Sequence, residues 1–148
     1  MVDERILHQK HYAEIRDKVL QDPYAKFLGI KLLELGEGMA KAELVIKDHM
    51  LNAHGTAHGA IIFALADFTF AAACNSYGKT AVALSVNIGF LAAAMEGNRL
   101  IATATEEKKN NRTAWYRIHV ETEHGLVATL DALAYRKNEY FVSVDPEV

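Results

Sequence analysis

Residues 52–74 of this chain read NAHGTAHGAIIFALADFTFAAAC, a loop rich in Gly, His and Asn that leads into a long apolar run. Alanine and leucine favour the helix, and the run is too long for an ordinary buried strand. The pattern therefore predicts a helix that begins near His58 or Gly59 and ends near Gly78, because glycine commonly follows a last helical turn. A helix that is apolar on every side belongs in the middle of a fold.

One carboxylate, that of Asp67, interrupts the apolar run. Burying an ionised carboxylate without partners costs several kcal/mol, so such a group is either paired with backbone or hydroxyl groups or retained for chemistry. Both interpretations of Asp67 are open at this point, and no other residue gives a stronger functional signal. Cys74, at the end of the run, is expected to serve in packing rather than as a nucleophile.

The length and composition fit one globular domain that spans residues 1–148. The formal net charge of −3 argues against nucleic acid as a partner, because phosphate binding needs a basic face. The single cysteine excludes an internal disulfide, and no segment has the pattern of a signal peptide, so we expect a cytoplasmic protein. The apolar run at residues 59–74 is shorter than a membrane span, so no membrane partner is expected.

The segments before the central helix change from a helical to an extended pattern. Apolar residues first recur at helical spacing, with Ile6, Tyr12 and Ile15 on one face, and Asp-Pro at residues 22–23 ends that pattern. Apolar and polar residues then alternate on both sides of a Gly-Glu-Gly turn, which is typical of a hairpin. The expected elements are a surface helix at residues 3–21 within the N-terminal segment 1–22, a helical turn at residues 24–28, and strands at residues 30–35 and 39–47.

The chain after Gly78 has the period-two alternation of strands. Asn110-Asn111 is a strong hairpin signal, because asparagine tolerates a positive φ, and from Asn138 onward we expect a partly ordered tail. The expected strands are residues 80–91, 98–108, 113–123 and 126–137. The whole order predicts an α+β domain in which an antiparallel sheet curls around one central buried helix.

The loop and the central helix together form a sequence motif. Asn52, Gly55, Thr56, His58, Gly59 and Asp67 match an Asn-x-x-Gly-Thr-x-His-Gly-Gly loop that is followed by an acid in the next helix. With this motif the chain resembles the hotdog-fold acyl-CoA thioesterases, and among them the phenylacetic-acid-degradation thioesterases, over about residues 24–137. Two positions depart from the family pattern: Ala60 replaces the second glycine, and Ala83 stands where some relatives carry a serine or threonine.

The resemblance implies a hotdog fold, acyl-CoA thioesterase activity and a site at the start of the central helix. A helix N-terminus exposes unpaired N–H groups and the positive end of the helix dipole, and glycine lets a ligand approach the backbone closely. We therefore expect the Gly59 N–H to stabilise the oxyanion that forms on a thioester, with His58 holding the carbonyl or its loop. Asp67 is expected to activate a water or to attack the thioester itself, and Asn52 to orient that water or carboxylate.

Some of these residues also have purely structural interpretations. A neutral His58 can tie a turn together, and Asn52 can serve as a simple turn residue. His54 and His58 have the i, i+4 spacing of a metal pair, but a glycine lies between them and the glutamate of the zinc motif is missing. We therefore expect no metal, and no cofactor apart from the coenzyme A that is part of the substrate.

The spacing of Gly59 and Asp67 predicts the quaternary structure. The two residues are eight positions apart on one helix, about 12 Å along its axis, whereas attack on a carbonyl needs a distance of about 3–3.5 Å. One helix cannot place both groups on one carbonyl, so they must come from two chains related by a two-fold axis. We expect a homodimer with composite active sites, and the resemblance extends this expectation to a tetramer.

Contacts with the rest of the substrate are less sharply indicated. Lys108, Lys109 and Arg112 flank the Asn-Asn turn and form either a solvated hairpin tip or a clamp for the phosphates of coenzyme A. Arg112 is the best single candidate, with Lys109 beside it, and the basic residues 136–137 are a second candidate pair. Thr56, in the motif loop, completes the candidate substrate contacts.

The acyl group and the class of activity leave alternatives. The aromatic residues line either an aromatic-acyl pocket or the core, and the resemblance favours aryl-acetyl or medium-chain substrates. A hotdog protein that binds acyl-CoA or a small acid without turnover is the main alternative, motivated by the missing hydroxyl at Ala83. A hotdog dehydratase would need a histidine paired with an acid, and the acid on the helix argues against it. The aromatic candidates are Phe63, Phe68, Phe70, Tyr77 and Phe90.

Overall fold

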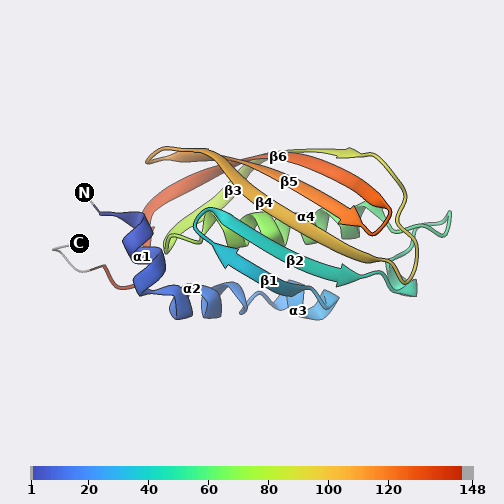
Figure 1. The fold of residues 1–148 in the computed structure, drawn as a ribbon, viewed down its shortest axis with the longest axis horizontal. Helices are drawn as coiled ribbons and strands as arrows, with labels where there is room; N and C mark the ends of the chain where they lie inside the picture. Colours follow the sequence, from blue (N-terminus) through green and yellow to red (C-terminus); the bar gives the residue numbers. More distant parts are fainter. Residues whose placement is uncertain (1, 145–148) are drawn as a thin grey trace.

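The computed structural model describes residues 2–144 of the chain (Figure 1). The elements in this range are α1 (Glu4–Lys10), α2 (Tyr12–Val19), α3 (Pro23–Leu28), β1 (Lys31–Gly36), β2 (Met39–Val45), a 3-10 turn (Asp48–Met50), α4 (Gly59–Cys74), β3 (Lys79–Phe90), β4 (Arg99–Lys109), β5 (Thr113–Thr122) and β6 (Gly125–Tyr140). Their order agrees with the predicted order, apart from a division of the N-terminal helix. No helix in the described range has both the length and the apolar character needed to cross a membrane.

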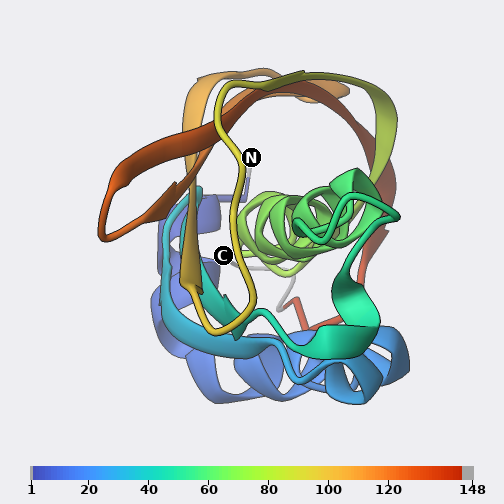
Figure 2. The ribbon, with the colours of Figure 1, turned by 90° about the vertical axis from the view of Figure 1, so that its right-hand side faces the viewer.

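In the described range, six strands form one antiparallel sheet in the order β1-β2-β4-β5-β6-β3. The sheet curls around α4, which Figure 2 shows nearly end-on inside the curve, while the N-terminal helices lie across the open side of the sheet. The curved sheet, the central helix and the N-terminal helices therefore pack as layers around a single core. The predicted α+β hotdog architecture is confirmed.

Small side chains on the concave face let the sheet approach α4 closely. Ala40 and Ala42 on β2 lie opposite Ala104 and Ala102 on β4, and all of them are completely buried. Larger helix residues such as Leu65, which is also completely buried, fill the remaining space. This alternation of small and large side chains gives the close packing of a protein interior.

The N-terminal segment differs from its prediction. The sequence pattern predicts one helix over residues 3–21, but the structure has α1 and α2, which are separated at His11, a residue with non-helical backbone angles. The break changes the direction of the chain, so Leu7 and Ile15 are completely buried while Ile6 is 48% exposed. The prediction of one helix was wrong because the helical spacing of apolar residues indicates a single helix only where the helix axis is continuous.

The central helix begins at Gly59 and ends at Cys74, close to its predicted limits, but it is not enclosed on every side. The sheet covers only part of its circumference, and the N-terminal helices leave a gap on the other side. The prediction of complete burial is therefore wrong for one face of α4. The residues of this open face are Ala60, Phe63, Ala64, Asp67 and Ala71, each exposed or only partly buried.

The last strand is longer than predicted. β6 continues to Tyr140, whereas the sequence predicts an irregular tail from Asn138. The N–H of Phe141 then donates to the carbonyl of Gly78 at 2.9 Å, which ties the end of β6 to the segment just before β3. The prediction missed this because pairing with the edge strand, rather than local sequence, extends β6. The end of the expected tail, residues 145–148, lies outside the described residues.

Strands β1 and β3 form the two edges of the sheet within the described chain. The edge strand β3 carries apolar side chains in solvent: Val82, Leu84 and Phe90 are between 41% and 58% exposed. An unpaired strand edge with apolar side chains favours pairing with another strand. This edge is therefore a candidate surface for association with a second chain.

Candidate active site

The side chain of Asn52 holds the loop that precedes α4. Its Oδ1 accepts hydrogen bonds from the backbone N–H groups of His54 (2.9 Å) and Thr56 (3.2 Å), and its Nδ2 donates to Thr56 Oγ1 (2.9 Å). The backbone N–H of Asn52 also donates to the carbonyl of Thr56 at 2.8 Å. Asn52 and Thr56 thus close the loop on itself, a structural role for both. Their predicted contacts with water or substrate stay predictions.

His58 caps the N-terminus of α4. Its Nδ1 accepts a hydrogen bond from the N–H of Ala60 at 3.0 Å, which places the proton of the neutral ring on Nε2. The backbone N–H of His58 donates to the carbonyl of Met50 at 2.8 Å, and the N–H of Ala57 donates to that of Ala94 at 2.8 Å. These bonds fix where the helix begins and where its first N–H groups point. The part of His58 in holding a substrate carbonyl stays a prediction.

Gly59 is the first residue of α4 and carries the candidate oxyanion donor. In the described part of the chain its backbone N–H has no acceptor, whereas the N–H of Ala60 and that of Ile61 both donate to His58. A Cβ at Gly59 would lie 3.1 Å from Cζ of Phe90, so glycine also fits the space beside that ring. An unpaired N–H at the positive end of a helix is a ready site for a developing negative charge.

Asp67 lies on the open face of α4, in a cleft of about 240 Å³ between α4 and α3. The residue is exposed, and within residues 2–144 its carboxylate has no hydrogen-bond or ion-pair partner. The expectation of a carboxylate buried in the middle of the fold is therefore wrong, because the sheet leaves this face of α4 open. The structural alternative, an acid satisfied by backbone or hydroxyl groups, is not what the structure shows.

The surroundings of Asp67 raise the pKa of its carboxyl group above the ordinary value for aspartate. The main cause is desolvation, since the cleft is walled by apolar residues that include Phe63, Ala64 and Phe68, and a smaller cause is the negative charge of Asp22. A carboxylate with a raised pKa is a stronger base toward water. The site thus provides an accessible, unpaired and basic carboxylate.

One chain does not bring Gly59 and Asp67 together. Both belong to the single helix α4, where eight positions of rise separate them by about 12 Å. The geometric reason for a second chain therefore holds in the structure, although the assembly itself stays a prediction. The exposed β3 edge and the open face of α4 are two surfaces that such a chain could cover.

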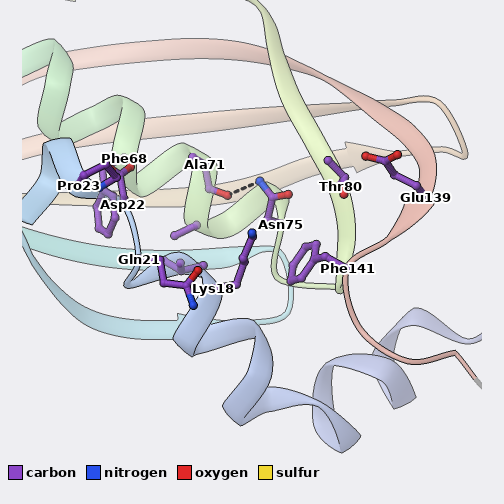
Figure 3. A pocket seen from close by; sticks show the side chains of 12 residues that line it. Lys18, Gln21, Asp22, Pro23, Phe68, Ala71, Asn75, Thr80, Glu139 and Phe141 are labelled. Carbon is purple, nitrogen blue, oxygen red and sulfur yellow. Dashed lines mark hydrogen bonds between the residues drawn. The ribbon is translucent and has the colours of Figure 1, made fainter.

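A second, larger cleft of about 770 Å³ adjoins the Asp67 cleft and runs along α4 (Figure 3). It shares Asp22, Phe68 and Ala71 with the Asp67 cleft, so the two form one groove along the helix. The floor is α4, one wall is the connection between α2 and α3, and the other comes from the start of β3 and the end of β6. The walls and floor also include side chains that no sequence pattern marks as functional: Lys18, Asn75, Thr80, Glu139 and Phe141.

The structure separates the three candidate substrate-binding residues. Thr56 lies in the loop beside Gly59, but the Nζ of Lys109 lies 3.5 Å from the ring centre of Tyr77, just beyond the other end of α4. The sixteen-residue helix is about 24 Å long, so Lys109 and nearby Arg112 are far from Gly59 of the same chain. The Nζ of Lys109 is also engaged in the chain itself, while Arg112 is exposed at the hairpin tip. Their contact with coenzyme A stays a prediction.

The cysteine and the histidine pair give no alternative site. Burial raises the pKa of the Cys74 thiol to about 12, so the thiol stays protonated and is a poor nucleophile. Among residues 2–144 there is no cluster of three or more His, Cys, Asp or Glu side chains that could hold a metal ion. The expectation of a reaction without metal or cofactor stays a prediction.

The fold and the site define a class of protein. The family model of the thioesterase superfamily matches residues 54–129, about half of the chain, and this range contains both Gly59 and Asp67. The chain belongs to the thioesterase superfamily. The predicted family resemblance and the prediction of a thioester hydrolase are therefore confirmed.

Within this class the chain is similar to several particular proteins. It is 40% identical to the acyl-coenzyme A thioesterase PaaI of Escherichia coli over 99 residues, which are 67% of this chain and 71% of that protein. The solved structure of the E. coli PaaI protein from the phenylacetic acid degradation operon superimposes with a TM-score of 0.85 at 33% identity, covering 90% of this chain and 98% of that chain. A proposed esterase of Archaeoglobus fulgidus is 42% identical over 133 residues, 89% of this chain and 83% of that protein.

Proposed function

We propose that the protein is an acyl-CoA thioesterase that hydrolyses an aryl-acetyl or medium-chain acyl-CoA to the free acid and coenzyme A. The pairing that supports this most strongly is on α4: an unsatisfied N–H at Gly59 and an unpaired, accessible carboxylate at Asp67. A thioester carbonyl needs a donor for its developing oxyanion and a base or nucleophile for attack. The helix supplies one of each, on an exposed face.

The two groups act from different subunits of a homodimer. On one route, Asp67 of the partner subunit takes a proton from a water molecule, and the water oxygen bonds to the carbonyl carbon. The Gly59 N–H donates to the oxyanion of the tetrahedral intermediate. The carbon–sulfur bond then breaks, the carboxylic acid is released, and the coenzyme A thiolate takes up the proton.

On the second route, Asp67 of the partner subunit attacks the carbonyl carbon directly. The coenzyme A thiolate leaves, and a mixed anhydride forms between the acyl group and Asp67. Water then cleaves the anhydride, which returns the carboxylate and releases the acid. The unpaired state of Asp67 in the described chain suits both routes, because no internal bond must be broken before it reacts.

The dimer follows from the surfaces as well as from the spacing of the two groups. Pairing of the β3 edge with a second copy would cover the exposed apolar residues Val82 and Leu84 and bring a second α4 toward the open face of the first. The family resemblance extends the proposal to a tetramer of two such dimers. The basic residues of one subunit, Arg112 among them, are then proposed contacts for the phosphates of coenzyme A bound at a shared site.

The groove along α4 supports an apolar acyl group. It leads from Asp67 over Phe68 and Ala71 toward Phe141, and its size of about 770 Å³ is ample for an aryl-acetyl or medium-chain group. The similar E. coli protein is named for acyl-coenzyme A thioesterase activity, and its solved structure for the phenylacetic acid degradation operon. Kinetics with a panel of aromatic and straight-chain acyl-CoAs would rank these substrates directly.

Substitution of Asp67 tests the proposed chemistry. Asp67→Asn keeps the shape of the side chain but removes its charge, so kcat should fall by about 10²–10⁴-fold. Asp17→Asn, at an exposed position on α2, is the matched control and should keep wild-type turnover. A folded, dimeric Asp67→Asn protein with full turnover would show that the carboxylate has been assigned the wrong role.

A binding protein without turnover is the second candidate function. Position 83 on β3 is alanine, so it offers no hydroxyl to position a water. Ser85 lies two residues further on, after a break in the regular pairing of β3 with β6. Calorimetry that detected acyl-CoA binding, together with no hydrolysis across the substrate panel, would favour this function over the first.

A further inference from the structure

Away from the groove, three basic side chains of the described chain gather around one carboxylate. The Nζ of Lys109 and the Nη2 of Arg136 lie 2.6 Å and 2.7 Å from the same atom, Oε2 of Glu4 on α1. Lys79 lines the same cleft, and its Nζ donates to the carbonyl of Asn111 at 3.2 Å. These groups come from α1, β3, β4 and β6, so the fold rather than a sequence motif brings them together.

Most of this charge is buried. Arg136 is 4% exposed and Lys79 is 7% exposed, whereas lysine and arginine are rarely buried without a full set of partners. The paired cations hold the pKa of Glu4 below its ordinary value in spite of burial, so Glu4 carries a full negative charge. Burial, and to a smaller extent the positive charges of Arg136 and Lys109, lower the pKa of Lys79.

The side chains that line the cleft include four basic ones, those of Arg5, Lys79, Lys109 and Arg136, and two acidic ones, those of Asp3 and Glu4. Glu106 does not line the cleft, and it accepts hydrogen bonds from the hydroxyl groups of Tyr77 (3.1 Å) and Tyr116 (3.3 Å). At the rim of the cleft, the charge of Asp3 is offset by that of Arg5. The cleft therefore has an excess of positive charge in a chain whose formal net charge is −3.

The cleft has both the room and the donors for an anion. Its volume is about 530 Å³, and it opens between α1 and the hairpin that joins β4 to β5. An ammonium group has three donors, and the bonds to Asn111 and Glu4 use one each on Lys79 and Lys109. Arg136 donates through Nη1 to the carbonyl of Asn110 at 2.7 Å, which fixes its guanidinium group at the base of the cleft.

We propose that Lys79, Lys109 and Arg136 form a binding site for a phosphate group, and that Glu4 is an internal anion which competes for it. Phosphate has the charge and the several acceptor oxygens that such a set of donors recognises. The phosphate group comes either from a free phosphorylated molecule or from the terminal phosphate of coenzyme A. The coenzyme A source rests on the proposed function, whereas binding of a free phosphorylated molecule does not, and no residue of the groove along α4 lines this cleft.

Calorimetric titrations test the site without any measurement of turnover. The probes are inorganic phosphate, coenzyme A and dephospho-coenzyme A, which lacks the terminal phosphate. Glu4→Gln removes the internal anion and should tighten binding of the phosphate group by about tenfold, while Lys79→Gln should weaken it by about tenfold. Matched controls are Glu14→Gln, an exposed acid on α2, and Lys31→Gln, an exposed lysine on β1 outside the cleft. Both controls should bind like the wild type.

The pattern of changes identifies the source of the phosphate. If the site takes a free phosphate, Glu4→Gln tightens the binding of inorganic phosphate. The ratio of the affinity for coenzyme A to the affinity for dephospho-coenzyme A then stays unchanged. If it takes the coenzyme A phosphate, Glu4→Gln raises that ratio. Thermal unfolding shows that each variant is folded. If folded Glu4→Gln and Lys79→Gln proteins bind all three probes like the controls, the cluster is only a structural ion pair and the proposal is wrong.

Discussion

The carboxylate of Asp67 has a raised pKa because apolar walls desolvate it and Asp22 repels its charge. The proposed hydrolysis needs the ionised form of Asp67, so activity should be lost as the pH falls through this raised pKa, which lies above the value of about 3.9 of an ordinary aspartate. For stability the sign is opposite to that of a salt-bridged acid. The contribution of Asp67 is present below its unfolded-state pKa and is lost as the pH rises through the raised folded-state pKa.

Asp22→Asn should move the acid limb of the pH profile of kcat/KM to lower pH. The substitution removes the negative charge near Asp67, which favours the ionised form of that carboxylate. The Oδ1 of Asp22 also caps α3 by accepting a hydrogen bond from the N–H of Ala25 at 2.9 Å, and asparagine keeps this cap. The rate at the pH optimum should therefore change little.

The measurement is the acid-limb pKa of wild type, Asp22→Asn and the control Asp17→Asn. Asp17 lies on α2 and is exposed, so its substitution should leave the profile in place. An Asp22→Asn profile identical to that of the wild type would mean that the acid limb reports a group other than Asp67.

At the scale of elements, the open face of α4 is expected to set the choice of acyl group. Ala71 lies where the Asp67 cleft meets the larger cleft, so Ala71→Leu should narrow the groove at that junction. We expect kcat/KM for phenylacetyl-CoA and octanoyl-CoA to fall by about tenfold, with little change for acetyl-CoA. The control is Ala13→Leu, at an exposed position on α2. An equal loss for all acyl groups would place the acyl group elsewhere.

The elements show what local sequence can predict. Glycine, histidine and the apolar run mark both ends of α4, and period-two alternation marks the strands, because these signals act over a few residues. No glycine or proline marks the break at His11 in the sequence. The break lets both Leu7 and Ile15 reach the buried interior, which depends on tertiary packing. Which face of α4 stays open depends on how far the sheet curls, a property of the assembled fold.

At the scale of the whole molecule, mixed dimers test the composite site. Gly59→Pro removes the candidate donor but suits the first position of a helix, and His58 before it has extended angles that proline accepts. The Cβ that proline adds would lie 3.1 Å from Cζ of Phe90, so this exposed ring must shift slightly. Each of Gly59→Pro and Asp67→Asn should be inactive alone. Co-expressed, the two chains should recover about a quarter of wild-type activity, because half of the dimers are mixed and each has one intact site.

Native mass spectrometry should confirm that mixed dimers are present in the co-expressed sample. A mixture of two Asp67→Asn chains with different tags is the control and should stay inactive. Mixed dimers without recovered activity would mean that Gly59 and Asp67 do not act on the same thioester from two chains.

The candidate site was partly visible in the sequence for a physical reason. Asn52, His58, Gly59 and Asp67 are close along the chain, so one loop and one helix place them without help from distant segments. The groove wall at Phe141 and the basic cluster of Lys79, Lys109 and Arg136 depend instead on residues that only tertiary packing brings together. Glu4 and Arg136, for example, are 132 positions apart. No periodicity or spacing rule links such residues before the sheet has closed.

If the proposed homodimer forms through the unpaired edge of β3, activity depends on how many copies of the protein are present. A folded monomer supplies only one member, Gly59 or Asp67, of each proposed catalytic pair, so it would be inactive even when fully folded. In dilute solution the rate per molecule should rise with protein concentration until nearly every chain is part of a dimer. A cell could then silence this enzyme simply by making less of it, with no inhibitor at all.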